Sequence, residues 1–488
     1  MQHGASDAAS RGASVAGTAP ATGADESATA WFHRVRMHAA TLMCAALAAC
    51  FNAPDRNPAT TAPPAPAEWT GTDQTARRIP DDWVGSFSDP VLSKVVKTAL
   101  SNNYDLKTAA ARVDAARAEA RIAGADRWPQ ISVVPSWAQD RVVDQGFGAQ
   151  EFNAYQILFN LTWELDVWGR IRASQQSAWR NAEAVAADLA GARLSIAART
   201  AQTYYELAEA QLQVQVAAQS IRDRKTIVDL VRGRFARGLT RGLDLRLALT
   251  DLADAEAQLA QAHNRVQIAS RQLETLLGQY PAGRFKDAAA LPAPPPTLPV
   301  GIPSDLLRRR PDLVASWQRL LSSDSRLEST RKSWLPRLTL TTDGGVRSPA
   351  LTQLFDPRSV IYNVGIGILQ PIFTGGRITG EIELDTARVE EALNSYRETT
   401  LNAFREVEQS LAAEERLRAQ EVALREAVEQ TIASQKLAVY SYQFGQIEIL
   451  TLLDSYRSWL SAQSAHLTVK RQLLENRINL YLALGGNV

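Results

Sequence analysis

Residues 153–167, NAYQILFNLTWELDV, decide the fold class because they alternate between apolar and polar side chains. The apolar residues at odd positions are Tyr155, Ile157, Phe159, Leu161, Trp163 and Leu165. A period of two is that of a β-strand with one apolar face, and this strand is long enough to cross a bilayer at a tilt. The pattern predicts a transmembrane strand. A half-buried hairpin of a soluble protein would show the same alternation, so that alternative stays open.

The same alternation returns 207 residues later, where Tyr362, Val364, Ile366 and Ile368 occupy every second position. Further matches share this offset, and they lie where elements are expected to begin or end: Asp105 and Asp312, Pro129 and Pro336, Gly169 and Gly376, Gly238 and Gly445, Gly278 and Gly485. Self-similarity at one fixed spacing indicates a repeated structural unit. The sequence therefore predicts an internal two-fold repeat.

We expect the first repeat to span residues 81–278 and the second 302–488, joined by a proline-rich linker at 279–301 on the outside of the structure. The first contains a helix at 90–126, a β-hairpin at 131–167 and a long helical hairpin at 171–277. The corresponding elements of the second are a helix at 303–333, a β-hairpin at 337–373 and a helical hairpin at 377–484. Trp128-Pro129 and Leu335-Pro336 separate helix from strand because proline disfavours helix in the residue before it.

Residues 171–234 contain few helix breakers and predict a helix of the order of 100 Å, long enough to cross a bacterial periplasm. Leucines at every seventh position of each return helix predict a coiled-coil seam. Leu453 of the second copy matches Arg246 of the first, one residue past Leu245, so we expect the two helical hairpins to pack differently.

The N-terminal residues 1–49 predict a disordered extension followed by a signal peptide, with Arg34 and Arg36 before an apolar run. Leu47-Ala48-Ala49-Cys50 resembles a bacterial lipobox, which implies acylation of Cys50 and sorting to the outer membrane. Ordinary cleavage after Ala48 is the alternative. Residues 50–80 then form a lipid anchor and a proline-rich linker that spaces the anchor from the body.

The composition excludes several classes of function. The net charge is +1, from 53 basic and 52 acidic residues, which offers no basic surplus for nucleic acid. Beyond the signal peptide the only cysteine is Cys50 and the only histidines are His263 and His466, so we expect no metal site and no cofactor other than the lipid. No nucleophile elbow, zinc-protease helix or phosphate loop is present, and we expect no catalytic residues. Four strands cannot close a barrel and lipid does not tolerate open sheet edges, so spanning strands require an oligomer.

Four motifs stand out along the chain: WVGSFSDPVL at 83–92, NYDL at 103–106, GIPSDLLRRRPDL at 301–313 and PIFTGGR at 371–377. Together they resemble the outer-membrane factors of tripartite efflux systems, which are TolC-like, and in particular the OprM or NodT type of outer-membrane efflux lipoprotein. The resemblance implies an α+β membrane protein: a homotrimer with a 12-stranded transmembrane β-barrel, four strands per subunit, continued by a long periplasmic α-helical barrel. It implies a passive conduit in the bacterial outer membrane that exports drugs or other small toxic molecules. Its partners would be a periplasmic adaptor and, through it, an inner-membrane pump of the RND or a similar class.

The same resemblance assigns candidate residues at the two turns between the long helices. Arg237, Gly238 and Leu239, and in the second copy Gly445, Gln446 and Ile447, would form the tips that meet the adaptor. As plain helix C-caps these glycines need no further function.

Leu450, Asp454 and Arg457 follow the second tip on one face of a helix. By resemblance they would form the hydrophobic and charged rings of a periplasmic gate, with salt bridges between subunits; the alternative is a solvated i,i+3 pair. The first copy has Leu243, Leu247 and Thr250 there, so we expect any charged lock to come from the second copy alone. The rival function is that of a periplasmic coiled-coil adaptor or a lipoprotein scaffold.

Overall fold

The computed structural model describes residues 51–66, 69–70, 82–144, 146, 148–288, 290–295 and 303–486. The signal peptide, Cys50 and much of the predicted linker up to residue 81 lie outside these residues. The chain divides into two units, Met1–Asn52 and Ala53–Val488, and all elements below belong to the second.

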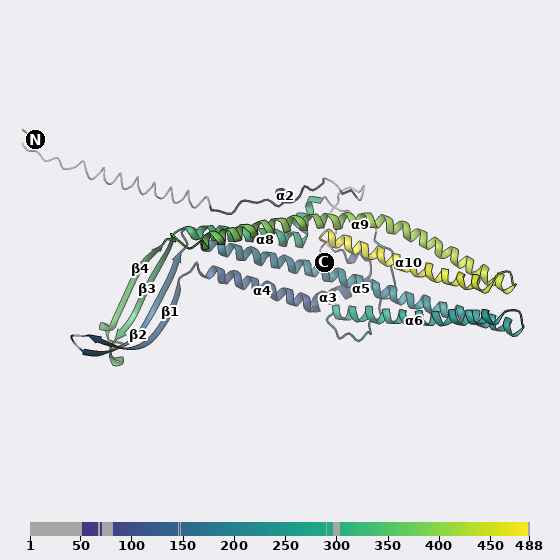
Figure 1. The fold of residues 1–488 in the computed structure, drawn as a ribbon, viewed down its shortest axis with the longest axis horizontal. Coiled ribbons are helices and arrows are strands. Elements are labelled where there is room, and N and C mark those ends of the chain that lie inside the picture. Colours follow the sequence, from purple (N-terminus) through teal and green to yellow (C-terminus); the bar gives the residue numbers. More distant parts are fainter. Residues whose placement is uncertain are drawn as a thin grey trace, which may run out of the picture. The chain divides into compact units, whose positions relative to one another are not determined.

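The elements follow each other in two similar series (Figure 1). After α2 (Pro58–Thr61) and η1 (Gly85–Phe87), the first series is α3 (Pro90–Asn102), α4 (Tyr104–Ala125), β1 (Gln130–Asp144), β2 (Gly148–Leu165), α5 (Arg170–Ala236) and α6 (Gly242–Leu276). The second is η2 (Pro303–Asp305), α7 (Leu306–Arg309), α8 (Pro311–Arg331), η3 (Lys332–Trp334), β3 (Arg337–Ser348), η4 (Leu351–Gln353), η5 (Pro357–Ser359), β4 (Val360–Leu369), α9 (Arg377–Gln443) and α10 (Ile449–Ala483). Both α5 and α9 have 67 residues, both α6 and α10 have 35, and each pair begins 207 residues apart (377 minus 170, 449 minus 242).

The prediction of one helix over 90–126 is wrong, because Asn103 divides it. Its side-chain oxygen accepts hydrogen bonds from the backbone N–H groups of Asp105 (2.9 Å) and Leu106 (3.2 Å), which caps the start of α4. Its amide donates to the carbonyl of Leu276 (3.1 Å). The predicted helix at 303–333 is also interrupted, at Arg310, because Pro311 disfavours helix in the residue before it.

The four strands form one antiparallel sheet in the order β1-β2-β3-β4. Val133 lies opposite Phe159, Phe159 opposite Gly344, and Gly344 opposite Tyr362. This register puts the odd positions of β1 and β2 on the same face as the even positions of β3 and β4. That face is largely apolar. The opposite face carries mainly polar side chains and glycine, as in the row of Asn160, Asp343 and Asn363.

The long helix α5 has different neighbours along its length (Figure 1). It packs against α4 and α8 in the part nearer the sheet, and against α6 and α10 beyond. Likewise, α9 packs against α8 and then against α10. Each long helix thus links the strand-proximal half of the helical layer to the distal half. Among the described helices, none is long and apolar enough to cross a membrane.

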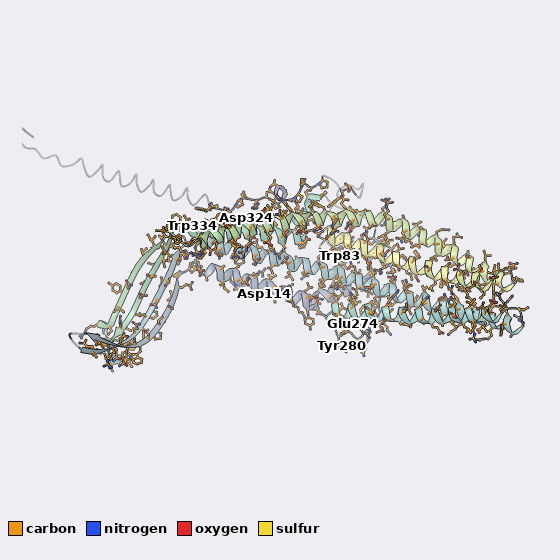
Figure 2. All side chains as sticks on the ribbon, in the orientation of Figure 1. Trp83, Asp114, Glu274, Tyr280, Asp324 and Trp334 are labelled. Carbon is orange, nitrogen blue, oxygen red and sulfur yellow. The ribbon has the colours of Figure 1, made fainter. Side chains whose placement is uncertain are left out.

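The largest hydrophobic cluster lies where these halves meet. Trp83, labelled in Figure 2, is fully buried and stacks on Tyr481 with ring centroids 5.6 Å apart. Phe87 contacts both Tyr481 and Tyr205. Because these aromatic rings come from the segment before α3 and from α5 and α10, the cluster fixes the N-terminal part of the body to both helical hairpins.

The two return helices bury different rows of side chains. In α6 the alanine row is buried (Ala248, Ala255, Ala262, Ala269), and of the leucines one turn away Leu245, Leu252 and Leu259 are half-buried and Leu273 is buried. In α10 the leucine row is more deeply buried, with Leu453, Leu467 and Leu474 at 1%, 8% and 0% exposure and Leu460 half-buried. The leucines of α10 are more deeply buried because α10 packs against both α9 and α5, whereas α6 packs mainly against α5.

The segment at the start of the body, within the predicted proline-rich linker, packs onto α8 and α9. Arg56 forms an ion pair with the buried Asp324 of α8 (2.6 Å), which is labelled in Figure 2. Ala53 N–H donates to Glu328 (3.0 Å), and the Tyr396 hydroxyl donates to the carbonyl of Pro58 (3.3 Å). These contacts fasten residues 53–58 along the helices.

Candidate docking tips and periplasmic gate

The first tip is the turn between α5 and α6. Gly238 takes the left-handed conformation (φ 72°), which lets its N–H donate to the carbonyl of Phe235 (2.9 Å) and that of Leu239 donate to Arg234 (3.0 Å). Asp244 caps the next helix, accepting from the backbone N–H of Arg241 (3.1 Å) and from the Thr240 hydroxyl (2.5 Å). The hydrogen bond from Thr240 is the main reason that the pKa of Asp244 lies below its usual value.

The second tip repeats this geometry between α9 and α10. Gly445 has φ 73°, its N–H donates to Tyr442 (3.0 Å), and that of Gln446 donates to Ser441 (2.9 Å). The donors and acceptors stand 207 residues from those of the first tip. Ile447 packs against the cluster of apolar side chains behind the tips.

An arginine joins the two tips. Arg234 donates from Nη1 to the carbonyl of Gln443 (2.8 Å), and its guanidinium lies 5.2 Å from the centre of the Tyr442 ring. Sequence reasoning missed this residue because an arginine near a helix C-terminus is ordinary. The contact makes the tips one surface.

That surface exposes large apolar side chains. The most exposed at the two turns are Phe235, Leu239, Leu243, Tyr440, Phe444 and Leu450, each between 45% and 65% accessible. Tyr440 and Phe444 also contact each other, with ring centroids 4.7 Å apart. Apolar side chains gathered at the end of a helical hairpin are typical of a protein-binding surface.

The three predicted gate residues lie in the first turns of α10, and all are accessible. Leu450 is 54% exposed, Asp454 is exposed, and the Arg457 side chain is 53% exposed. In the described part of the chain, no residue forms an ion pair with Asp454.

Arg457 does not pair with Asp454 within the subunit, so the alternative of a solvated i,i+3 pair is wrong. Its Nε lies 2.9 Å from Oδ1 of Asp251 on α6. The other carboxylate oxygen of Asp251 lies 2.6 Å from Nε of Arg224 on α5, and the side chains of Asp251 and Arg224 are 2% and 3% exposed. One carboxylate therefore joins three helices.

The partner of Arg457 belongs to the first copy, since Asp251 lies in α6. It follows Thr250, which is the residue that matches Arg457 at the 207-residue offset. Nothing in the spacing of α10 pointed to it, because the partner is set by how α6 packs against α5. Among the described residues, no group of three or more metal-ligating side chains is present.

The fold and the sequence identify the class of protein. The model of the outer membrane efflux protein family matches the chain twice, at residues 95–279 and at 302–486. The chain belongs to this family, and it is an outer-membrane channel component of an efflux system, with a TolC-like fold of long helices and a strand sheet.

Named relatives agree with this class. The chain is 31% identical over 434 residues to the pyoverdine export outer membrane protein OpmQ of Pseudomonas putida, covering 86% of this chain and 92% of that protein. It is 30% identical over 462 residues to the outer membrane protein OprJ of Pseudomonas aeruginosa, covering 92% and 95%. The first is named as an export outer membrane protein and the second as an outer membrane protein.

Solved structures show the same fold. The outer-membrane channel OprN superimposes with a TM-score of 0.84 at 29% identity, over 90% of this chain and 99% of that one. The open state of the Neisseria gonorrhoeae outer membrane channel MtrE gives 0.78 at 25% identity, over 89% and 98%. The family match also overturns the rival prediction of a periplasmic adaptor or scaffold.

Proposed function

We propose that three copies of this chain form a passive conduit through the outer membrane, with a 12-stranded barrel and a periplasmic helical barrel built from two repeats per subunit. The conduit exports drugs or other small toxic molecules that an inner-membrane pump delivers through a periplasmic adaptor. The observation that carries the proposal is the four-stranded sheet with one apolar face and two free edges.

The sheet supports the trimer because it is incomplete alone. Among the described strands, β1 pairs only with β2 and β4 pairs only with β3. Edges without partners are not tolerated in lipid, whereas pairing β1 of one copy with β4 of the next removes them. Three copies supply twelve strands, an even number within the range of outer-membrane barrels. Acylation of Cys50 would add an anchor beside the barrel.

The joined tips support docking of the adaptor. Their exposed apolar side chains offer area that association would bury, and Arg237 and Gln446 add polar contacts at the rim. Because Arg234 links one tip to the other, the adaptor would meet both tips as one surface.

The gate is proposed to close when Leu450, Asp454 and Arg457 of the three subunits meet around the axis. Within a subunit, the Arg457–Asp251 pair holds α10 against α6, and Asp454 is left accessible to a neighbouring subunit. Opening moves the second hairpin outward and breaks the half-exposed pair. The buried Arg224–Asp251 pair stays intact and keeps α5 bound to α6.

Single-channel conductance in planar bilayers tests the gate. We expect Asp454→Ala/Arg457→Ala to raise the open-to-closed ratio, because a half-exposed ion pair worth about 0.5–1 kcal/mol shifts it about two- to fivefold per subunit. Asp229→Ala/Arg232→Ala is the matched control, since it removes an exposed i,i+3 pair from α5. An unchanged open-to-closed ratio in the first variant would contradict the gate assignment. An equal rise of this ratio in the control would contradict it as well.

A further inference from the structure

A pocket of about 530 Å³ opens beside α3, between this helix, the segment before it and α5. Val84 and Val96 are buried and form an apolar floor with the half-buried Leu100. Lys97 and Arg193 are exposed at its rim. The volume suits a short peptide or a drug-sized molecule.

Basic side chains outnumber acidic ones in the lining of this pocket. A hollow on the same helix shares Lys97 with it and adds Lys94. In the described part of the chain, no ion pair is formed by Lys94, Lys97 or Arg193. The acidic residue of the lining, Asp82, accepts a hydrogen bond from the backbone N–H of Gly85 (3.0 Å). The lining thus holds two basic side chains, Lys97 and Arg193, and one acidic side chain, Asp82, with Lys94 in the adjoining hollow.

Hydroxyl groups complete the lining. Ser93 donates to the carbonyl of Asp89 (3.1 Å) and Ser101 donates to that of Thr98 (2.9 Å). Each hydroxyl oxygen keeps lone pairs that can accept a hydrogen bond from a ligand N–H. The pocket therefore offers cations for carboxylates, acceptors for amides and an apolar floor for small side chains.

We propose that this pocket binds the acidic peptide stems of the cell wall. Such stems are short, contain small apolar residues, and carry carboxylates that lysine and arginine recognise by charge-assisted hydrogen bonds. Arg193 lies 23 residues into α5 (193 minus 170), about 35 Å along the helix at 1.5 Å per residue. This inference rests on the proposed function, under which this level of the tube lies in the periplasm and meets the cell wall.

Co-sedimentation of the purified full-length protein with isolated cell-wall sacculi tests the proposal. We expect Lys94→Glu/Lys97→Glu/Arg193→Glu to weaken binding at least about tenfold. The control Lys225→Glu/Arg284→Glu/Lys286→Glu makes the same charge change at exposed positions outside the pocket and should bind like the unmodified protein. The unmodified protein should bind a soluble disaccharide–tetrapeptide fragment at least about tenfold more tightly than the same fragment with its carboxylates amidated.

Three results would overturn the assignment. Equal binding of sacculi by the pocket and control variants excludes the pocket, and full binding to glycan stripped of its peptides excludes the stems. Competition by hexaglutamate that matches the cell-wall fragment would mean that the pocket recognises charge alone, as an acidic protein segment would supply. Planar-bilayer conductance separates this proposal from the proposed function, since a protein that binds sacculi but forms no channel refutes only the latter.

Discussion

Asp251 joins α5, α6 and α10 through a single carboxylate. It is buried between Arg224 and Arg457, so replacing it leaves one arginine buried without a counter-charge. Breaking a buried pair in this way costs several kcal/mol, whereas losing a half-exposed partner costs far less.

We therefore expect Asp251→Asn to lower the free energy of unfolding by about 3–5 kcal/mol and Arg457→Ala by about 1 kcal/mol or less. Chemical denaturation of the purified protein measures both. Asp229→Asn, whose side chain is 73% exposed, is the control and should change stability little. Equal losses in Asp251→Asn and Asp229→Asn would contradict the role given to the buried carboxylate.

Glu274, labelled in Figure 2, fixes the linker that follows α6. Its carboxylate accepts from the backbone N–H groups of Gly283 (2.6 Å), Arg284 (2.6 Å) and Phe285 (3.1 Å). Burial alone would raise the pKa of Glu274, but these donors outweigh it, and the pKa lies below its usual value. The stabilisation is thus present above about pH 4.3, the ordinary glutamate pKa, and is lost as the pH falls through the lowered pKa.

We expect Glu274→Gln to accelerate amide hydrogen exchange at residues 283–285, because a charged acceptor worth about 1.5–3 kcal/mol is replaced by a neutral one. In the unmodified protein the same amides should lose protection only in acid. Glu256→Gln, at an exposed position of the same helix, is the control. Unchanged exchange in Glu274→Gln would show that the linker is held by other contacts.

At the scale of elements, the tips depend on two glycines in a conformation that other residues rarely adopt. A Cβ at Gly238 would meet no atom within 4 Å, so any cost of Gly238→Ala comes from the backbone alone. We expect a loss of about 1–2 kcal/mol in local stability, measured by hydrogen exchange across the turn. Weaker adaptor binding in a pull-down should accompany it.

Gly233 gives a matched control only five residues earlier. A Cβ there also meets nothing within 4 Å, but Gly233 lies within α5, where alanine is favoured. Gly233→Ala should stabilise the helix by roughly 0.5–1 kcal/mol. If both substitutions changed the local stability of the turn in the same direction, the conformational account of Gly238 would be wrong.

The elements show what a sequence can and cannot predict here. Proline, glycine and period-two alternation are local signals, and they indicated the strands and the turns at Gly238 and Gly445. The break at Asn103 was missed although its cap is local, since asparagine also occurs within helices and only the accepted bonds from Asp105 and Leu106 show that it begins a new one. The partner of Arg457 was missed because Asp251 is positioned by helix packing and not by spacing.

At the scale of the whole molecule, the family and its outer-membrane efflux function followed from motifs spread along the chain, and the comparisons confirmed them. The trimer, the adaptor and the gate remain predictions. The free strand edges and the accessible tips show where a single copy could bind a partner. They do not show that the neighbouring subunits or the adaptor bind there. The cationic pocket beside α3 could not be predicted, because Arg193 is brought to α3 only by the fold.

The most direct test of the central claim is the mass of the protein extracted from outer membranes in mild detergent, measured by native mass spectrometry. The free edges of the sheet predict an oligomer, because β1 of one copy must pair with β4 of the next, and the proposed function predicts that it holds three chains and is converted to single chains by boiling. A stable single chain under the mild conditions would contradict the account, since its two strand edges would then lie open in the membrane.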